Sequence, residues 1–224
     1  MDKKAGAARN SDIYRLTSAI ANWLNGASVF DYLGDHLIPS DAGTLYIDPD
    51  SRSGRGFYNF VTGRLLTGID PKFDWDNPIV RDGIRNLETE YDSIATYFWI
   101  RAFYASYKGD PNNLKDGYLK SILLVKTYKH IFTSKASATH YTGPENVDPA
   151  RKRQRCKGQT TQSTRDPVAT LIGMNEVTAR SIAYAAVILH FCLNNASKWT
   201  IVHDGFSYIS LYDSITSGNA FPPT

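Results

Sequence analysis

Several features that would identify a membrane, secreted or zinc-binding protein are missing from this chain of 224 residues. No apolar run reaches the roughly 18 residues needed to cross a bilayer, because the longest is interrupted by His190 and bounded by Arg180 and Asn194. The first dozen residues lack the apolar core of a secretory signal. The two cysteines, Cys156 and Cys192, have no zinc-type spacing with histidine. We therefore expect a soluble, intracellular protein with no membrane partner and no metal site.

Recognisable catalytic motifs are also missing. The chain contains no G-x-S-x-G nucleophile elbow and no glycine-rich loop of the kind that cradles phosphates. Carboxylates cluster at Asp74 and Asp76 and again at Glu88, Glu90 and Asp92. Metal or acid–base chemistry would need these groups to converge with a histidine or with each other, and nothing in their spacing brings them together, so we favour solvated acidic turns. We expect no cofactor, and we favour a non-catalytic protein over an enzyme while leaving both open.

What the chain does contain is one strongly apolar helix. Residues 178–195, TARSIAYAAVILHFCLNN, are apolar around almost the whole circumference of a helix. A helix without a polar face must be surrounded by other elements, so this segment is predicted to lie at the centre of the fold. His190 and Cys192 are two positions apart on it and point about 200° apart, so they do not form a thiol–imidazole pair.

Other helices are predicted from capping residues, proline and glycine positions and apolar periodicity. The first is amphipathic, begins after Asn10, Ser11 and Asp12 and ends at Gly26. Asparagine or aspartate followed by proline is a helix start, and it occurs at 77–78 and again at 110–111, where the pattern continues to about residue 132. Weaker patterns predict a short helix near 29–36, a helix rather than a strand at 97–104, a short element at 167–173 and a final helix over 206–217.

Together these elements predict a mostly α fold, a single compact helical domain of six or seven helices around the apolar helix, with long loops. Hydrophobic residues make up 42% of the chain and charged residues 21%, which is ordinary for a globular domain. Residues 1–10 are expected to be disordered and residues 11–224 to form the domain. A flexible basic loop is expected at about 135–167, where the sequence is small, polar and proline-containing.

The positive charge of the chain is concentrated in that loop. The net charge is +3, and one short run supplies five of the 25 basic residues. The other 20 stand against 22 acidic residues, so the rest of the chain is close to neutral. A short basic run in a flexible segment is typical of a nuclear import signal or a nucleic-acid tether, and a plain solvated loop remains an equal alternative. Its basic residues are Arg151, Lys152, Arg153, Arg155 and Lys157.

Four pieces of the sequence together resemble a domain family expanded in mushroom-forming basidiomycete fungi and catalogued as of unknown function. They are RGFYNFVTGRLL at 55–66 with the Asp74-Trp75 pair, LLVKTYKHIFTS at 123–134, Thr164-Arg165, and VTARSIAYAAVILHFCLNN at 177–195. Their order and spacing match over residues 11 to 217. The chain departs from the family pattern at Thr67-Gly68, where Cys-Pro is usual, and at Lys135, where proline is usual. The resemblance implies an intracellular fungal protein and supplies no catalytic residue.

The matched segments also contain five cationic or titratable side chains that define a candidate anion site. Arginine forks bind phosphate and carboxylate in two-point contacts, so convergence of these residues would form an anion pocket, although we favour separate surface salt bridges. His130, near a predicted helix end, fits a cation stabilised by the helix dipole better than a general base. The five residues are Arg55, Arg64, Lys129, His130 and Arg165.

Two functional hypotheses therefore remain. The first is a non-catalytic binding module that recruits a protein or nucleic-acid partner, with the basic loop adding electrostatic affinity. The alternative is an enzyme or small-ligand-binding protein that holds an anion against Arg, Lys and His side chains. We favour the first. An import signal would place the protein in the nucleus, and otherwise we expect it in the cytoplasm.

Overall fold

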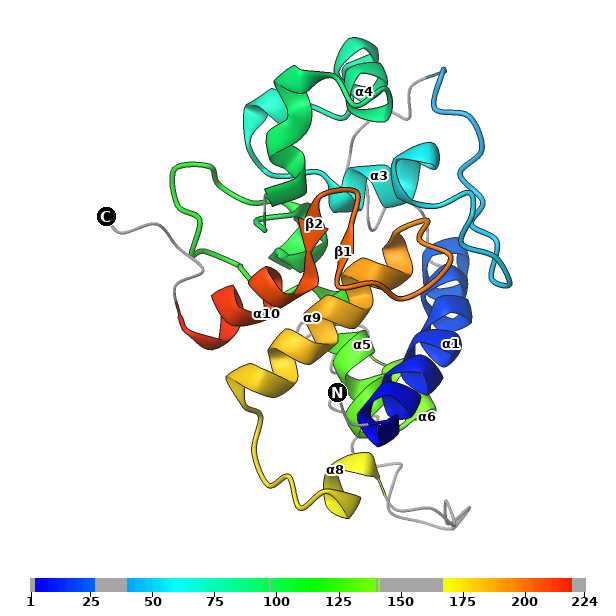
Figure 1. The fold of residues 1–224 in the computed structure, drawn as a ribbon, viewed down its shortest axis with the longest axis vertical. Helices are drawn as coiled ribbons and strands as arrows, with labels where there is room; N and C mark the ends of the chain where they lie inside the picture. The colour runs from blue at the N-terminus through cyan, green and yellow to red at the C-terminus, as the bar shows by residue number, and fades with distance from the viewer. Residues whose placement is uncertain (1–2, 27–39, 97, 140, 142–166, 219–224) are drawn as a thin grey trace, which may run out of the picture.

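The computed structural model describes residues 3–26, 40–96, 98–139, 141 and 167–218. In this part of the chain the fold is mostly helical, as predicted, with one two-stranded hairpin (Figure 1). The α-helices are α1 (Lys3–Gly26), α3 (Phe60–Leu66), α4 (Pro78–Arg85), α5 (Ile122–Phe132), α6 (Lys135–Thr139), α8 (Val168–Leu171), α9 (Ala179–Leu193) and α10 (Tyr208–Thr216). Short 3-10 turns are η1 (Gly56–Tyr58), η2 (Pro71–Phe73), η3 (Thr89–Thr96), η4 (Arg101–Phe103) and η5 (Ala105–Tyr107).

The apolar helix is the centre of the main core, as predicted. Every residue of α9 from Ala185 to Leu193 is buried, and α9 contacts α1, α3, α5 and α10. Its N-terminus is fixed by a reciprocal capping box between Thr178 and Ser181. Burial of an almost wholly apolar helix on all sides is the main source of stability here, because the hydrophobic effect scales with the apolar area removed from water.

Helix α1 is longer than predicted. It begins at Lys3, so residues 3–10, which we expected to be disordered, are helical. The segment before Asn10 is rich in alanine and lysine, which are good helix formers, and they extend the helix past the capping residues. The Asp12 carboxylate instead accepts a hydrogen bond from the Tyr184 hydroxyl of α9 at 2.8 Å. The predicted end of the helix at Gly26 is confirmed.

Two predictions in the middle of the chain need correction. Helix α4 starts at Pro78 with the Asn77 cap, as predicted, but α5 starts only at Ile122. The Asp110 side chain closes a turn by accepting the Asn112 N–H at 2.8 Å, and Leu119 has a φ of 59° that no α-helix accommodates. The aromatic run at 98–104 forms no α-helix; it contributes the turn η4 and an isolated bridge from residue 100 to residue 68.

The expected basic loop is only partly described. Residues 135–139, which we placed in the loop, form the short helix α6. Residues 142–166, with the basic run and Arg165, lie outside the described residues, as does the short helix expected near 29–36. The element predicted at 167–173 is confirmed as α8. No helix among the described residues is long and apolar enough to span a bilayer.

The sequence interpretation missed the β-hairpin of β1 (Val202–His203) and β2 (Phe206–Ser207). Val202 pairs with Ser207, and His203 pairs with Phe206. The turn residues at positions 204 and 205 have φ values of 47° and 78°, which fits the type I′ turn favoured by Asp-Gly. This dipeptide was the available signal. Helix α10 follows the hairpin directly and ends before Gly218, as predicted.

A second, smaller hydrophobic core lies between α3, α4 and the segment that follows α4. Trp75 is 1% exposed and donates a hydrogen bond to the Phe60 carbonyl at 2.9 Å. A Cβ at position 63 would lie 2.2 Å from this indole, so the packing requires Gly63. We call this group of buried residues the second core: Ala42, Phe60, Phe73, Trp75, Ile84 and Tyr91.

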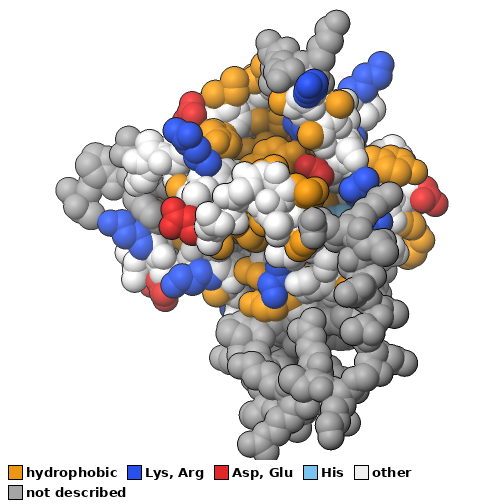
Figure 2. Space-filling model, turned by 90° about the horizontal axis from the view of Figure 1, so that it is seen from below, with side chains coloured by type: hydrophobic (Ala, Val, Ile, Leu, Met, Phe, Trp, Pro, Cys, Tyr) orange, Lys and Arg blue, Asp and Glu red, His pale blue; other side chains and the backbone are white. Residues whose placement is uncertain are grey.

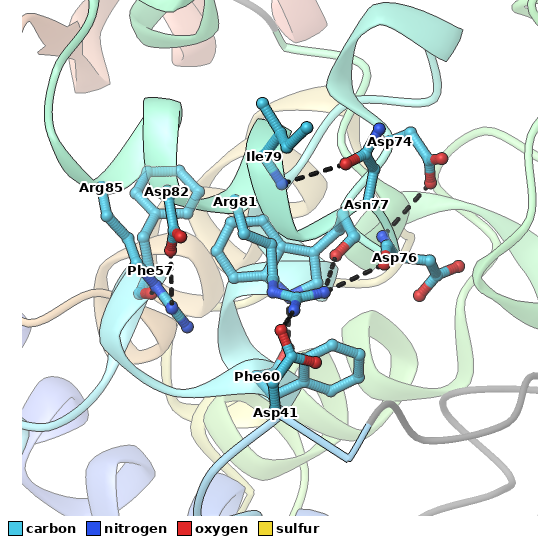
Figure 3. A network of polar contacts seen from close by, with 11 residues as sticks. Asp41, Phe57, Phe60, Asp74, Asp76, Asn77, Ile79, Arg81, Asp82 and Arg85 are labelled. Atoms are coloured by element: carbon cyan, nitrogen blue, oxygen red, sulfur yellow. Dashed lines mark hydrogen bonds and ion pairs between the residues drawn. The ribbon is translucent and has the colours of Figure 1, made fainter.

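The second core is held by arginines, which Figure 3 shows converging on backbone carbonyls and carboxylates. Arg81 is 1% exposed and donates to the carbonyls of Trp75 and Asp76 at 2.9 and 3.0 Å. It also pairs with the Asp41 carboxylate. Arg85 donates from Nε to a carbonyl of the turn η1. These arginines therefore have structural partners.

Candidate anion-binding groove

An open groove of about 1420 Å³ lies along α1, and we call it the α1 groove. Its remaining sides come from residues 49–53, from α5 and α6, and from residues 195–199 after α9. Segments far apart in sequence therefore meet at this site. In Figure 2, a space-filling view from below, charged side chains of both signs are scattered between apolar ones.

Five cationic side chains line the α1 groove, against one carboxylate, that of Asp50. None of the five forms an ion pair with a residue that the structure describes. Unpaired cations around a concave surface raise the local positive potential, because low-dielectric walls focus the field. The geometry therefore suits an anionic ligand. The five side chains are Arg9, Arg15, Arg52, Lys135 and Lys198.

Two of these arginines lie on one aromatic wall. The Arg9 guanidinium lies 4.6 Å from the centre of the Trp199 ring, and the Arg52 guanidinium lies 4.1 Å from that of Phe191. The two rings contact each other, with centroids 5.0 Å apart. Cation–π contacts orient a guanidinium without neutralising it. Both arginines are thus held in place with their charge available.

Arg52 is also fixed to the end of α9. Its guanidinium donates to the carbonyls of Phe191 and Ser197, both at 3.3 Å. The last carbonyls of a helix have no intrahelical partner and carry partial negative charge, which favours a cation there. Burial lowers the pKa of Arg52 from its usual value, but arginine remains protonated at neutral pH.

Arg55, a predicted site residue, is structural. It is 1% exposed, and its guanidinium donates to the carbonyls of Cys192, Thr17 and Asp48 at 2.8, 2.9 and 2.7 Å. It therefore joins the end of α9 to the middle of α1 and to the segment before η1. Burial lowers the pKa of Arg55 to about 10, which leaves it charged at pH 7. Because the guanidinium already donates to these three carbonyls, it offers no two-point contact to a ligand.

His130 lines the α1 groove, but the expectation that it is a cation is wrong. Burial, followed by the charges of Lys135 and Arg15, lowers the pKa of His130 to about 4, so the imidazole is neutral at pH 7. These effects outweigh the helix dipole. The ring packs edge-on against Trp23, with centroids 6.0 Å apart. A neutral imidazole offers one donor and one acceptor.

Arg64 and Lys129, two other predicted anion-site residues, have separate partners. Arg64 is almost buried and pairs with Asp76. The Lys129 ammonium lies 4.2 Å from the centre of the Tyr141 ring. Arg165 lies outside the described residues. Of the four predicted residues that the structure describes, only His130 lines the α1 groove.

His190 and Cys192, which we expected not to meet, contact different neighbours. The His190 imidazole stacks on Phe206 with centroids 3.8 Å apart and planes 9° apart. The Cys192 Sγ lies 3.8 Å from the Ile13 carbonyl. Burial raises the pKa of the Cys192 thiol to about 11, so the thiol is protonated and unreactive at neutral pH.

Comparison with known proteins gives a family and no activity. The model of a family of unknown function, DUF6698, matches residues 3–218, nearly the whole chain. No curated protein and no solved structure matches it.

Proposed function

The chain belongs to the DUF6698 family of unknown function, and we propose that it is a non-catalytic binding module whose α1 groove holds a single strand of nucleic acid. The observation that carries this proposal is the set of five cations facing one carboxylate, without ion-pair partners among the described residues. Arg64, Arg81 and Arg85 around the second core each pair with an aspartate, whereas the five groove cations have no such pair and can contact phosphates.

The size and chemistry of the α1 groove favour a polymer over a single small anion. A groove of about 1420 Å³ exceeds the roughly 300–1,000 Å³ typical of small-molecule sites. Single strands bind where cations follow the phosphates and aromatic rings stack on the bases. Tyr14, which is 83% exposed, lines the groove and supplies such a ring.

The test is the salt dependence of binding. We expect fluorescein-labelled dT and U oligomers of about 20 nucleotides to bind with an affinity that falls roughly a hundredfold between 50 and 200 mM salt, if five phosphates are neutralised. Fluorescence anisotropy at several salt concentrations gives the salt slope, which is the change in log affinity per unit change in log salt concentration. Weak binding that does not depend on salt, or competition by inorganic phosphate at millimolar concentration, would instead support the small-anion alternative and contradict the proposal.

A matched pair of variants locates the contact. Arg15→Ser with Lys198→Ser removes two exposed cations from the α1 groove and is expected to reduce the salt slope by about 1.4. Lys108→Ser with Lys120→Ser makes the same charge change at exposed positions that do not line the groove. Equal losses in both variants would show non-specific attraction and would overturn the proposed site.

A third variant separates the α1 groove from the basic run. Replacing Arg151, Lys152, Arg153 and Arg155 with serine removes the predicted tether. We expect a smaller loss of affinity than from the groove variant. Binding that depends on this run alone would contradict the groove proposal and make the run the nucleic-acid contact.

We also propose an intracellular role in a fungal cell, as the sequence resemblance implies, with import into the nucleus through the basic run. A fusion of residues 145–162 to a fluorescent protein tests the import. Nuclear enrichment that is lost when the four basic residues become serine supports it, and a purely cytoplasmic signal refutes it.

A further inference from the structure

A second cavity, of about 250 Å³, lies where the two hydrophobic cores meet. Its lining includes Ile84 and Tyr91 from the second core and Ile100 and Phe206 from the main core. Small ligands often bind at boundaries between structural units. An apolar cavity of about 150 Å³ holds benzene, so this boundary cavity has room for a fused two-ring molecule.

The polar groups at the boundary cavity are few and specific. His190 is 4% exposed, and its Nδ1 has no hydrogen-bond partner among the described residues. Close by, the His203 Nε2 lies 3.2 Å from the Asn195 Oδ1. Unpartnered buried polar atoms are rare because burial without a hydrogen bond is costly. A ligand with a hydrogen-bonding group at this end would meet two imidazoles and an amide.

Most of the charged groups at the boundary cavity are already paired. Arg85 lies 3.6 Å from the Asp82 carboxylate, and His203 lies 3.3 Å from that of Asp204. Burial and the neighbouring His203 lower the pKa of His190 to about 3, so its ring is neutral at pH 7. The boundary cavity therefore lacks the unpaired cations of the α1 groove, and it suits a neutral ligand.

Leu87, at the rim of the boundary cavity, has a backbone conformation that favours glycine. Its φ is 55°, because α4 ends in a Schellman motif. The Leu87 N–H bonds to the Ile84 carbonyl at 3.3 Å, and the Glu88 N–H bonds to the Gly83 carbonyl at 3.0 Å. The position before Glu88 in this motif is usually glycine. Backbone strain of this kind concentrates at ligand sites.

The Leu87 side chain contributes little to the folded core, because it is 73% exposed. It does line the boundary cavity. A strained, exposed leucine in place of glycine is explained if its side chain packs against a bound molecule. We propose that the boundary cavity binds a small neutral aromatic molecule that carries one hydrogen-bonding group and has about the size of indole.

Indole itself is the probe. We expect it to bind with a Kd of about 0.1–1 mM, as ligands of about nine heavy atoms can, with saturable amide shifts at residues 190–195 and 203–206 in a two-dimensional NMR titration. Benzoate, which is anionic, should bind at least tenfold more weakly at these residues. No saturable indole shift, shifts confined to the α1 groove, or equal affinity for benzoate would overturn the proposal.

Substitutions of Leu87 separate binding from folding. Asparagine has a similar size and tolerates positive φ, so Leu87→Asn should weaken indole binding about three- to tenfold without lowering the melting temperature. Leu87→Gly should weaken binding similarly and raise the melting temperature, since it relieves the strain. Ile79→Asn is the matched control, because Ile79 lies in α4, the helix that Leu87 follows, is 76% exposed and does not line the cavity. Equal effects of Leu87→Asn and Ile79→Asn on indole affinity would refute the role of Leu87.

Discussion

The second core and the α1 groove both contain arginines, and the arginines of the two regions contact different kinds of partner. Around the second core, Arg64, Arg81 and Arg85 each pair with an aspartate, and the last two also donate to carbonyls. In the α1 groove, Arg9 and Arg52 lie over aromatic rings and have no carboxylate partner among the described residues. The same residue type thus builds the fold in one region and leaves positive charge available in the other.

The difference follows from local sequence. Residues 74–92 are rich in carboxylates, and two of them pair with Arg64 and Arg85. Arg81 pairs instead with Asp41, from the segment before η1. The polar face of α1 carries few acids, and its one aspartate near Arg15, Asp12, is occupied by the Tyr184 hydroxyl. Burial raises the pKa of Asp12, and the Tyr184 hydrogen bond and the charge of Arg15 oppose this shift. A groove bordered by such a helix keeps its cations unpaired.

The largest expected effect is at Arg81, the most connected arginine of the second core. Arg81→Met keeps the aliphatic bulk but leaves two carbonyls and the Asp41 carboxylate without their donor. Each carbonyl left without its donor costs about 1–2 kcal/mol, and the pair with the half-exposed Asp41 adds about 1 kcal/mol or less, so the total is about 3–5 kcal/mol. Urea unfolding should show this loss in the free energy of unfolding. Arg85→Met, whose aspartate pair is more exposed, should cost about 1 kcal/mol, and an equal cost would contradict the ranking.

Arg55 belongs with the structural set although it lies beside the α1 groove. Arg55→Met would leave three carbonyls without a donor, at about 1 kcal/mol each, or about 3 kcal/mol in total. Denaturant unfolding measures the stability, and anisotropy at temperatures well below unfolding measures nucleic-acid affinity. We expect the folded variant to keep its affinity. A loss of affinity with unchanged stability would place Arg55 in the binding set instead.

Two histidines allow the core and the α1 groove to be compared through the pH dependence of stability, because His190 is in the core and His130 is in the groove. Burial holds the pKa of His190 at about 3, below the value of about 6.5 in an unfolded chain. The unfolded state therefore binds more protons as the pH falls, and stability decreases. From pH 8 to pH 5, His190 is expected to lower the free energy of unfolding by about 2 kcal/mol. It should be smaller for the more exposed His130, whose charge is screened by solvent.

The variant His190→Phe tests this sign, since a phenyl ring can keep the stack on Phe206. Urea unfolding at pH 8 and pH 5 should show a smaller pH dependence in the variant than in the native protein, and His130→Phe should change it less. The same pH dependence in His190→Phe and the native protein would mean that burial does not control this histidine.

Much of the helical fold follows from the sequence, because its signals are local. The all-apolar α9, the Asn77-Pro78 start of α4 and the Gly26 end of α1 each depend on a few neighbouring residues. The late start of α5 could not be read in this way. It depends on Leu119 in a left-handed conformation, which packing imposes against the intrinsic preference of leucine.

The candidate site was much less predictable than the fold. Arg55 and His130 were singled out from matched segments, yet one is a buried clamp and the other a neutral ring. The groove cations were missed because Arg9, Arg52 and Lys198 are far apart in sequence and converge only in the folded chain. The one local signal was the basic, acid-poor polar face of α1. Tertiary proximity decides both pairing and pKa, and spacing in sequence does not reveal it.

The smallest effect on stability is expected from the groove variant itself, Arg15→Ser with Lys198→Ser. Both side chains are exposed and form no ion pair with a described residue, so the free energy of unfolding should change by less than about 0.5 kcal/mol. Removal of two like charges from one groove relieves some repulsion, so a slight gain is the expected direction. Urea unfolding and oligonucleotide anisotropy on the same sample give both quantities. A loss above about 1 kcal/mol would show that these cations hold the fold together, as Arg81 does, and the contrast between the two regions would fail.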